Sequence, residues 1–389
     1  MNRLRSIVLS SLGLFLCSVG IGISTASGAE LDFGEVRAYL DQAIDEKIVA
    51  GGVVLVMHHD EIVFETGFGY ADIQKKTPFQ VSTPVVIASI SKPMLATAAF
   101  RLAESGKLQM NVPISKYLPE FGTLKLESGS DVSRAPTMIE LFTHTSGMRS
   151  DYAVGGRPWF ADWTKNQPLS FVVAKYARDF RLRSEPGTRF AYSGIGTDVA
   201  ARVMEVADGK FRDEILIQEV CIPLGMDHTS YRSEVSATTE TSMPKRYYRA
   251  KDGRLLVQRQ RDLPAPNRYS ASGGSIVSTA GDLAKWLTMY RDGGVHHGRP
   301  FLSEESYRAM MISANVGKAA QGGFFIRETG ADGKPKVIGH TGSSGTSVWI
   351  DFDHDVIGIM LTQTAAKDSL GFRAELEKRI HQCFTMQLQ

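Results

Sequence analysis

The chain has 389 residues, of which 43% are hydrophobic and 22% are charged, a composition typical of globular proteins and unlike that of disordered or fibrous chains. Its formal net charge is +2. Removal of residues 1–29 would take away Arg3 and Arg5 and no acidic residue, which leaves basic and acidic residues equal in number. Such a balance gives no electrostatic support for nucleic-acid binding, and we expect none.

The N-terminus has the three-part pattern of a secretory signal peptide. Arg3 and Arg5 precede an uncharged apolar stretch over residues 7–23, and a run of small residues follows it. We therefore expect residues 1–29 to be a signal peptide and residues 30–389 to form one mature domain. The mature protein would be periplasmic or secreted, with no stable membrane insertion after cleavage. A retained anchor is the alternative, because the apolar stretch approaches the length of a spanning helix, about 20 residues.

Two cysteines, Cys221 and Cys383, lie outside that N-terminal segment. In an oxidising compartment they allow one disulfide without requiring it. We expect two free buried thiols and keep the disulfide as the alternative.

The first elements of the predicted domain are a helix and a hairpin. Apolar residues at helical spacing predict an amphipathic helix over residues 33–48. Two apolar runs, 53–57 and 62–64, flank a polar turn and predict a β-hairpin that Gly67 and Gly69 close.

The rest of the chain alternates between helical and strand patterns. A helix is expected from Ser89 to about Gly106, followed by a largely helical region over residues 111–268. A final helix is expected over residues 372–384. The strand pattern returns before it, in residues 324–326, 337–338, 347–350 and 356–361. Strands from both ends imply one antiparallel sheet that is built from distant parts of the chain and flanked by helices.

Ser89 and Lys92 form a Ser-x-x-Lys pair at the start of one predicted helix. A spacing of three residues on a helix places both side chains on one face, where the lysine can take the serine proton or stabilise the alkoxide. The free N–H groups of a helix N-terminus would add oxyanion-stabilising donors. A helix-capping serine beside a solvated lysine is the alternative, and Ser91 also fits a cap.

Two further motifs follow in order: Tyr192–Gly194 (Tyr-Ser-Gly) and His340–Ser343 (His-Thr-Gly-Ser). With Ser-x-x-Lys they resemble the three-motif signature of class C β-lactamases, D-alanyl-D-alanine peptidases and β-lactamase-like esterases. Residues 137–148, 223–226 and 273–283 extend the resemblance over nearly all of the chain after the predicted signal peptide. It implies a β-lactamase/transpeptidase-like fold of the α/β class (α+β type), an antiparallel sheet flanked by helices with a largely helical inserted region.

The resemblance implies catalytic roles for three residues. Ser89 would be the nucleophile, Lys92 its hydrogen-bonded partner and Tyr192 the proton shuttle beside them. A phenol keeps its proton in neutral water, so Tyr192 would need a cationic neighbour such as Lys92. Without the motif, a buried tyrosine bonded to a backbone group is the alternative for Tyr192.

The resemblance also implies a substrate-binding edge strand formed by His340, Thr341, Gly342 and Ser343. Gly342 would let substrate approach the backbone closely. Histidine stands where many β-lactamases have lysine, so His340 would anchor a substrate carboxylate only below a pKa near about 6.5. The backbone N–H groups of Ser89 and Ser343 would form the oxyanion hole.

Gly194 departs from the Tyr-x-Asn pattern of many family members. Glycine cannot supply a side-chain amide to the lysine or to a substrate amide. The loss matters most for acylamino substrates such as penicillins and peptides, and it favours ester hydrolysis or a weak, broad hydrolase.

Other histidines are assigned no chemistry. The pairs His58–His59 and His296–His297 lack the spacing of metal-hydrolase motifs and are expected in exposed turns. His144 is expected in a structural, hydrogen-bonded loop under the cleft. We expect neither a metal ion nor a cofactor.

These motifs predict an exported serine hydrolase that forms an acyl-Ser89 intermediate with a β-lactam, a D-alanyl peptide or a carboxylic ester. A non-catalytic or weakly acylated penicillin-binding-like protein is the alternative, and a membrane-tethered regulator is a third hypothesis. The expected partner is a small-molecule or peptide substrate. The sequence leaves the choice of substrate and the oligomeric state open.

Overall fold

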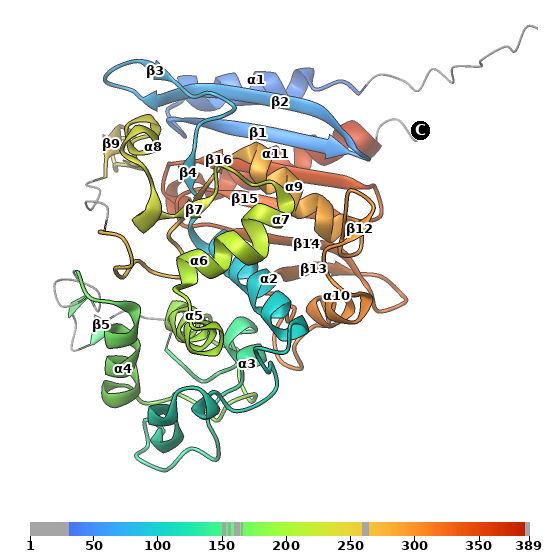
Figure 1. Ribbon diagram of the computed structural model, residues 1–389. Coiled ribbons are helices and arrows are strands. Elements are labelled where there is room, and N and C mark those ends of the chain that lie inside the picture. The colour runs from blue at the N-terminus through green and yellow to red at the C-terminus, as the bar shows by residue number, and fades with distance from the viewer. Residues whose placement is uncertain are drawn as a thin grey trace, which may run out of the picture. The chain divides into compact units, whose positions relative to one another are not determined.

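A seven-stranded antiparallel sheet organises the structure (Figure 1). The computed structural model describes residues 31–149, 153–154, 157–158, 164, 166–258 and 264–385. The strand order is β13-β14-β15-β16-β1-β2-β3, so strands from both ends of the chain meet inside one sheet. Its strands are β1 (Gly51–His58), β2 (Glu61–Asp72), β3 (Thr77–Pro78), β13 (Phe325–Thr329), β14 (Pro335–Thr341), β15 (Ser347–Asp351) and β16 (Val356–Thr362).

The pairing of β1 with β16 joins the N-terminal and C-terminal strands, with Val54 opposite Met360. Every residue of β16, and every residue of β1 except the last, is buried. Helices on both faces of the sheet account for this burial, and for the continuous apolar runs of these strands. α1 (Gly34–Asp45) packs with α11 (Ala366–Thr385), whereas α9 (Ala280–Arg291) packs against β1 and β16.

A largely helical region connects β3 to β13, as the sequence predicted. Its other α-helices are α2 (Ser91–Glu104), α3 (Met138–Phe142), α4 (Leu169–Asp179), α5 (Gly194–Asp208), α6 (Arg212–Leu216), α7 (Ile222–Leu224), α8 (Ala237–Ser242) and α10 (Glu304–Met311). Short 3₁₀ or π segments are η1 (Ala88–Ile90), η2 (Ile114–Lys116), η3 (Pro119–Thr123), η4 (Ile217–Cys221) and η5 (Arg232–Glu234).

Small sheets lie within the same region. β4 (Val85–Val86), β10 (Ile276–Ser278) and β7 (Ser230–Tyr231) form one sheet of three strands. Two-stranded pairs are β5 (Ala153–Val154) with β6 (Arg157–Pro158), β8 (Tyr247–Arg249) with β9 (Leu255–Val257), and β11 (Val295–His296) with β12 (Arg299–Pro300).

Helix α2 is buried along most of its length, and its packing fixes the position of Lys92. The hydroxyl of Thr97 accepts the indole N–H of Trp286 at 3.1 Å and lies 3.0 Å from the hydroxyl of Tyr290. Both aromatic residues belong to α9, so buried hydrogen bonds tie the two helices together. Pro93 stands in the first turn of α2, where its missing N–H costs little.

The first hairpin is longer than the sequence predicted. β2 continues to Asp72, so Gly67 and Gly69 lie inside the strand and do not close the hairpin. A Cβ atom on Gly67 would lie only 2.2 Å from the carbonyl oxygen of Phe79. Gly67 is therefore needed where a second backbone crosses the strand closely.

Strand β14 is not an edge strand, so the prediction for residues 340–343 was wrong in this respect. β13 pairs with β14 as far as Gly339, which lies opposite Phe325, and β15 pairs along the other side. Only His340 and Thr341 extend beyond β13. The open edge is therefore two residues long.

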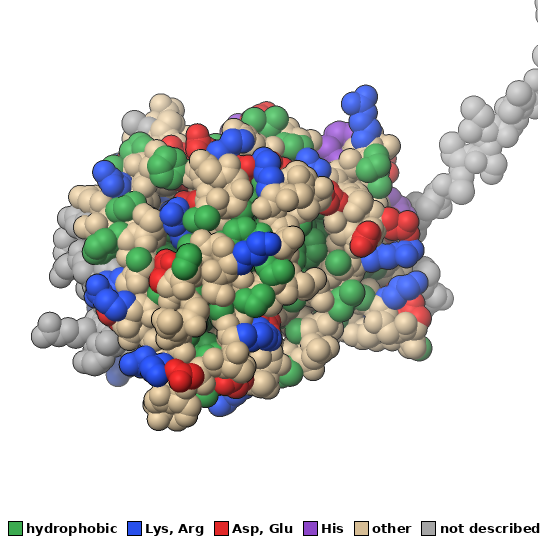
Figure 2. Space-filling model, turned by 60° about the horizontal axis from the view of Figure 1, so that its bottom comes forward, with side chains coloured by type: hydrophobic (Ala, Val, Ile, Leu, Met, Phe, Trp, Pro, Cys, Tyr) green, Lys and Arg blue, Asp and Glu red, His purple; other side chains and the backbone are tan. Residues whose placement is uncertain are grey.

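Basic and acidic side chains are interspersed on the face drawn in Figure 2, in keeping with the balanced composition. Among the described residues, none of the helices combines the length and the apolar character that crossing a bilayer requires. The predicted signal peptide lies outside those residues.

The two cysteines of the described chain are both free. Cys221 is buried and Cys383 is partly buried, which agrees with the expectation of free thiols.

Candidate active site

Ser89 and Lys92 meet where η1 joins α2. The Nζ atom of Lys92 donates a hydrogen bond of 3.0 Å to Oγ of Ser89. Lys92 is 4% exposed, whereas Ser89 is partly open to solvent. Ala88, directly before Ser89, has φ of 50°, a left-handed conformation that costs a non-glycine residue on the order of 1 kcal/mol. The serine is therefore presented to the lysine from a strained turn.

A second contact to Lys92 comes from Gly273. Nζ donates to the Gly273 carbonyl oxygen at 2.8 Å. A Cβ atom at position 273 would lie 3.0 Å from Cγ, Cε and Nζ of Lys92, closer than ordinary van der Waals contact. Glycine therefore lets this backbone lie against the lysine. Sequence analysis included Gly273 only within a matching segment, because a backbone carbonyl leaves no residue-type signal.

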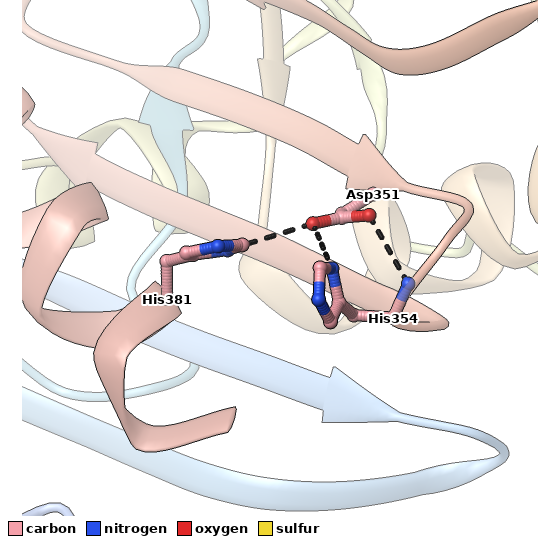
Figure 3. A group of neighbouring side chains, drawn as sticks. All are labelled: Asp351, His354 and His381. Atoms are coloured by element: carbon pink, nitrogen blue, oxygen red, sulfur yellow. Dashed lines mark hydrogen bonds and ion pairs between the residues drawn. The ribbon is translucent and has the colours of Figure 1, made fainter. Parts of the chain in front are cut away.

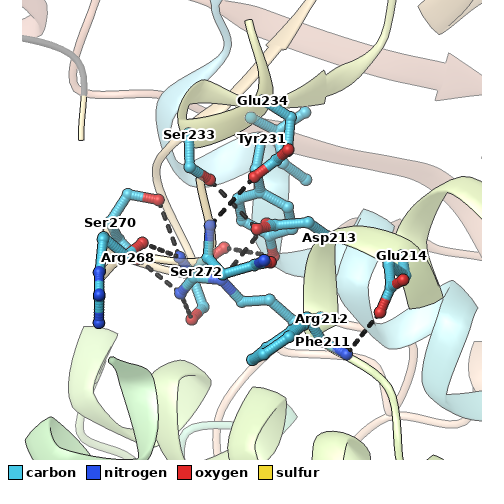
Figure 4. A network of polar contacts seen from close by, with 12 residues as sticks. Phe211, Arg212, Asp213, Glu214, Tyr231, Ser233, Glu234, Arg268, Ser270 and Ser272 are labelled. Atoms are coloured by element: carbon cyan, nitrogen blue, oxygen red, sulfur yellow. Dashed lines mark hydrogen bonds and ion pairs between the residues drawn. The ribbon is translucent and has the colours of Figure 1, made fainter. Parts of the chain in front are cut away.

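Two buried charged side chains hold the segment 270–274 in place. Arg212 donates to the carbonyl oxygen of Ser270 and to the hydroxyl of Ser272, both at 2.6 Å (Figure 4). Asp198 accepts the backbone N–H of Ser272 at 2.7 Å. The residue after Ser272 carries the carbonyl that receives the lysine, so this network positions the lysine indirectly.

The carboxylate of Asp198 is fully buried, and burial is the largest influence on it. Burial raises the pKa of Asp198, against the opposing effects of the Ser272 and Tyr269 hydrogen bonds and of the Arg212 charge. The carboxylate also accepts the hydroxyls of Tyr176 at 3.0 Å and Tyr269 at 2.8 Å. Asp198 thus joins α4, α5 and the segment 270–274.

Tyr192 stands just before α5, whose first turn is capped by Ser193. Oγ of Ser193 accepts the N–H of Gly196 at 3.0 Å, and the Ser193 N–H donates to Nδ1 of His144 at 3.2 Å. These bonds hold the Tyr192 ring centroid 4.9 Å from Nζ of Lys92. The structure therefore brings the tyrosine to the lysine. Among the described residues, the Tyr192 hydroxyl has no hydrogen-bond partner.

His144 supports this arrangement from below, in the structural role expected of it. Its carbonyl oxygen accepts the N–H of Ala191 at 2.7 Å, while its ring centroid lies 4.3 Å from that of Tyr192. Burial, then the charge of Lys92, lowers the pKa of His144 well below its usual range. The loop thus presents a neutral imidazole to the tyrosine ring.

His340 is buried near the end of β14. Its Nδ1 lies 2.9 Å from the carbonyl oxygen of Thr341, and because a carbonyl only accepts, Nδ1 carries the proton. Burial, then the charge of Lys92, lowers the pKa of His340 from 6.5 to about 3. The expectation that His340 loses its positive charge at a pH near 6.5 was therefore wrong. His340 is neutral at physiological pH.

Phe325 links His340 to the tyrosine. Its ring centroid lies 5.2 Å from that of His340 and 6.3 Å from that of Tyr192. Sequence analysis assigned Phe325 to a strand and missed it as part of the site, since one aromatic residue in an apolar run carries no separate signal.

The turn after β14 is fastened to the segment before Ser89. Oγ1 of Thr346 donates to the Ile87 carbonyl oxygen at 2.9 Å. A Cβ atom on Gly342 would lie 2.6 Å from that same oxygen, so Gly342 is required for the close approach. Ser343 is exposed, and its backbone N–H donates to no acceptor in the part of the chain that the structure describes.

The predicted site residues thus come from three separate segments. The Lys92 ammonium lies beside both the Ser89 hydroxyl and the Tyr192 ring. His340–Ser343 lies beside the turn that precedes the serine, with the side chains of Thr341 and Ser343 exposed and Gly342 buried.

A family model described as Beta-lactamase matches residues 36–381. The chain belongs to the β-lactamase family. Two curated relatives are similar to this chain over much of its length. The D-alanyl-D-alanine-carboxypeptidase/endopeptidase AmpH of Escherichia coli K12 is 26% identical over 322 residues, or 80% of this chain and 77% of AmpH. Esterase EstB of Burkholderia gladioli is 30% identical over 287 residues, or 65% of this chain and 69% of EstB.

Solved structures establish the fold of this β-lactamase-family chain. EstCE1, described as a hydrolase with promiscuous acyltransferase activity, aligns with a TM-score of 0.72 at 23% identity and covers 86% of this chain and 93% of EstCE1. An octameric penicillin-binding protein homologue from Pyrococcus abyssi aligns with a TM-score of 0.67 at 23% identity, over 85% and 73% of the two chains. The β-lactamase/transpeptidase-like prediction is confirmed, and the chain is an enzyme of the serine hydrolase type.

Proposed function

We propose that this chain hydrolyses carboxylic esters through an acyl-Ser89 intermediate, with Lys92 and Tyr192 as the acid–base groups. The observation that supports the proposal most directly is the hydrogen bond of 3.0 Å between Nζ of Lys92 and Oγ of Ser89. A serine hydroxyl is a poor nucleophile without a group that takes its proton, and this pair supplies that group.

In the acylation step, Oγ of Ser89 attacks the ester carbonyl carbon while its proton passes to the Lys92–Tyr192 pair, one member of which must be deprotonated, as the Lys92 amine or the Tyr192 phenolate, to accept it. The carbonyl oxygen becomes an oxyanion, which the backbone N–H groups of Ser89 and Ser343 would stabilise. Collapse of the intermediate expels the alcohol, which takes the proton and leaves an acyl-serine ester. Water then attacks that ester and gives up a proton to the same pair. The pair passes this proton to Oγ of Ser89 as the acyl–oxygen bond breaks, which releases the acid and restores the Ser89 hydroxyl.

Two features favour a neutral ester over substrates with a carboxylate beside the scissile bond. His340, whose pKa is lowered to about 3, offers no positive charge at neutral pH. The charge of Arg327 also lowers the pKa of His340, and Arg327 itself is ion-paired with Glu377. Its charge is therefore already partnered by a carboxylate of the protein. Gly194 offers no amide to an acylamino group. β-Lactams and D-alanyl peptides carry both a carboxylate and an acylamino group. They would therefore lose more binding interactions at this site than a neutral ester does. The similarity to EstB supports the same choice.

Hydrolysis of D-alanyl peptides is the second candidate function, favoured by the similarity to AmpH over most of both chains.

The decisive experiment removes the hydroxyl of Ser89. We expect the wild-type protein to hydrolyse p-nitrophenyl butyrate and Ser89→Ala to lose about 10³-fold or more in kcat/KM, because no other oxygen replaces the nucleophile. A fluorophosphonate probe should label the wild type and not the variant. Nitrocefin and a D-Ala-D-Ala peptide are measured on the same preparations.

Ser91→Ala is a matched control. The Ser91 hydroxyl accepts the N–H of Ile276 at 3.2 Å, so its loss should leave probe labelling intact. Undiminished hydrolysis or labelling in Ser89→Ala would refute the assignment. Faster turnover of the peptide than of the ester would favour the AmpH-like function, and no turnover of the ester would refute the proposed esterase activity.

We also propose that the protein is exported, on the basis of the signal-peptide pattern in residues 1–29. N-terminal sequencing of the protein recovered outside the cytoplasm should begin at Glu30. Recovery of the uncut chain in the membrane fraction would support a retained anchor.

A further inference from the structure

Three side chains that bind transition metals in many proteins lie close together where α11 passes the turn between β15 and β16 (Figure 3). Asp351 ends β15, His354 lies in the turn and His381 belongs to α11. One candidate ligand atom from each lies within 4.8 Å of the other two. No sequence motif indicates the cluster, because the third member comes from a different element.

The carboxylate of Asp351 is held in a fixed orientation. Its Oδ1 accepts the backbone N–H groups of Asp353 and His354, each at 3.1 Å. The Asp351 side chain is 7% exposed. These contacts leave Oδ2 facing the imidazoles, in the way that outer hydrogen bonds orient a metal-binding carboxylate.

Both imidazoles direct Nδ1 toward that Oδ2. The distances are 2.8 Å for His354 and 3.5 Å for His381. Bonds of about 2.0–2.2 Å to a tetrahedral zinc ion place ligand atoms roughly 3.4 Å apart. The His381 distance already fits, and the His354 distance has to widen by a fraction of an ångström. The histidines are 30% and 50% exposed, so they can adjust and leave room for water.

Histidines are concentrated at this end of β1 and β16. The sequence has nine. His58 ends β1 opposite Val356, and His59 bonds Asp355 at 2.7 Å, which places both beside the β15–β16 turn. A donor set of two imidazoles and one carboxylate suits zinc better than it suits calcium or magnesium, which prefer oxygen ligands.

We propose that Asp351, His354 and His381 bind one Zn²⁺ ion, with water in the fourth position. Two imidazole nitrogens and one carboxylate oxygen are a donor set that zinc takes in proteins. The ion would fasten the C-terminal helix to the sheet, since His381 belongs to α11 and the other two ligands belong to the β15–β16 turn. The alternative is a hydrogen-bonded cluster that binds no metal.

The test uses the purified protein after removal of metal with a chelator. Calorimetric titration with ZnCl₂ should saturate at one equivalent. Saturating Zn²⁺ should also raise the Tm of the protein by several degrees, because the folded state alone presents all three ligands together. Co²⁺ should give the visible absorption of a four-coordinate site. Mg²⁺ should produce neither effect.

The variant His354→Ala/His381→Ala should lose both zinc binding and the Tm increase. His297→Ala is the matched control, because His297 belongs to a separate pair of neighbouring imidazoles, with His296, whose ring centroids lie 4.1 Å apart. Zinc binding that the double variant retains, or a wild type that does not saturate at one equivalent, would overturn the proposal. Ester hydrolysis should be unchanged in the double variant, so this outcome is independent of the proposed function.

Discussion

The charge of His340 depends on its surroundings far more than on its residue type. The side chain is buried, its Nδ1 donates to the Thr341 carbonyl, and the Lys92 ammonium acts on it. Burial and the Lys92 charge both oppose the binding of a second proton to the imidazole, whereas the hydrogen bond to Thr341 favours it. A neutral imidazole can hydrogen-bond a substrate but cannot attract a carboxylate by charge.

The lowered pKa of His340 predicts acid sensitivity of folding. Between its unfolded value of 6.5 and its folded value of about 3, the unfolded chain binds the proton and the folded chain does not. The free energy of unfolding should therefore fall as pH falls through this range, by at most about 1.4 kcal/mol per pH unit. Urea unfolding of His340→Asn, which keeps a donor for Thr341, should lose less stability between pH 7 and pH 5 than the wild type. Equal losses would contradict the prediction.

At the scale of elements, the segment 270–274 shows how a backbone positions a catalytic side chain. It offers Lys92 a carbonyl, and Asp198 and Arg212 fasten it from the helical region. Lys92 therefore has two directed hydrogen bonds, to Ser89 and to Gly273, that restrict its long side chain.

Two adjacent glycines of that segment allow a matched test. A Cβ atom on Gly273 meets Lys92 at 3.0 Å, whereas nothing lies within 4 Å of one on Gly274. Gly273→Ala should displace the ammonium from Ser89 and lower kcat for the ester by about 10-fold or more, with KM changed less. Gly274→Ala should behave as wild type. Similar kcat losses in both variants, with Tm measured in parallel, would rule out a positional role for Gly273.

At the scale of the whole molecule, buried polar contacts join α4, α5 and α6 to the segment 270–274 that carries the Gly273 carbonyl. Asp198 alone accepts three donors, from Ser272, Tyr176 and Tyr269. Arg212 is 2% exposed and depends on nearby carboxylates for its countercharge. Both carboxylate oxygens of Asp198 are hydrogen-bonded, so the removal of this side chain leaves buried donors without partners.

Asp198→Ala should destabilise the protein by on the order of 3 kcal/mol, because three donors lose their acceptor and the buried Arg212 guanidinium loses one of its nearby negative charges. Asp198→Asn keeps an acceptor oxygen and should cost less. Urea unfolding at neutral pH measures both. Ester hydrolysis by the folded fraction of Asp198→Ala should also fall, since Gly273 is released. A stability within error of wild type in the alanine variant would contradict this account.

Local patterns in the sequence determined much of the fold and the identity of the central residues. The continuous apolar runs of β1 and β16 and the Ser-x-x-Lys spacing at Ser89 and Lys92 are local patterns along the chain, and such patterns are visible without a structure. The order of the motifs predicted the family. The length of β2 was predicted less well. Gly67 lies inside the strand because the backbone at Phe79 passes close to it, and no local pattern in the sequence indicates that contact.

Only the tertiary structure decided the features that arise between distant segments. The Gly273 carbonyl reaches Lys92 across 181 residues, His340 is neutral because it is buried near Lys92, and His381 approaches Asp351 from another element. Burial, and the effect of one charge on another, depend on distance in space. A sequence records distance along the chain, so it identified the groups but not their charges, supports or partners.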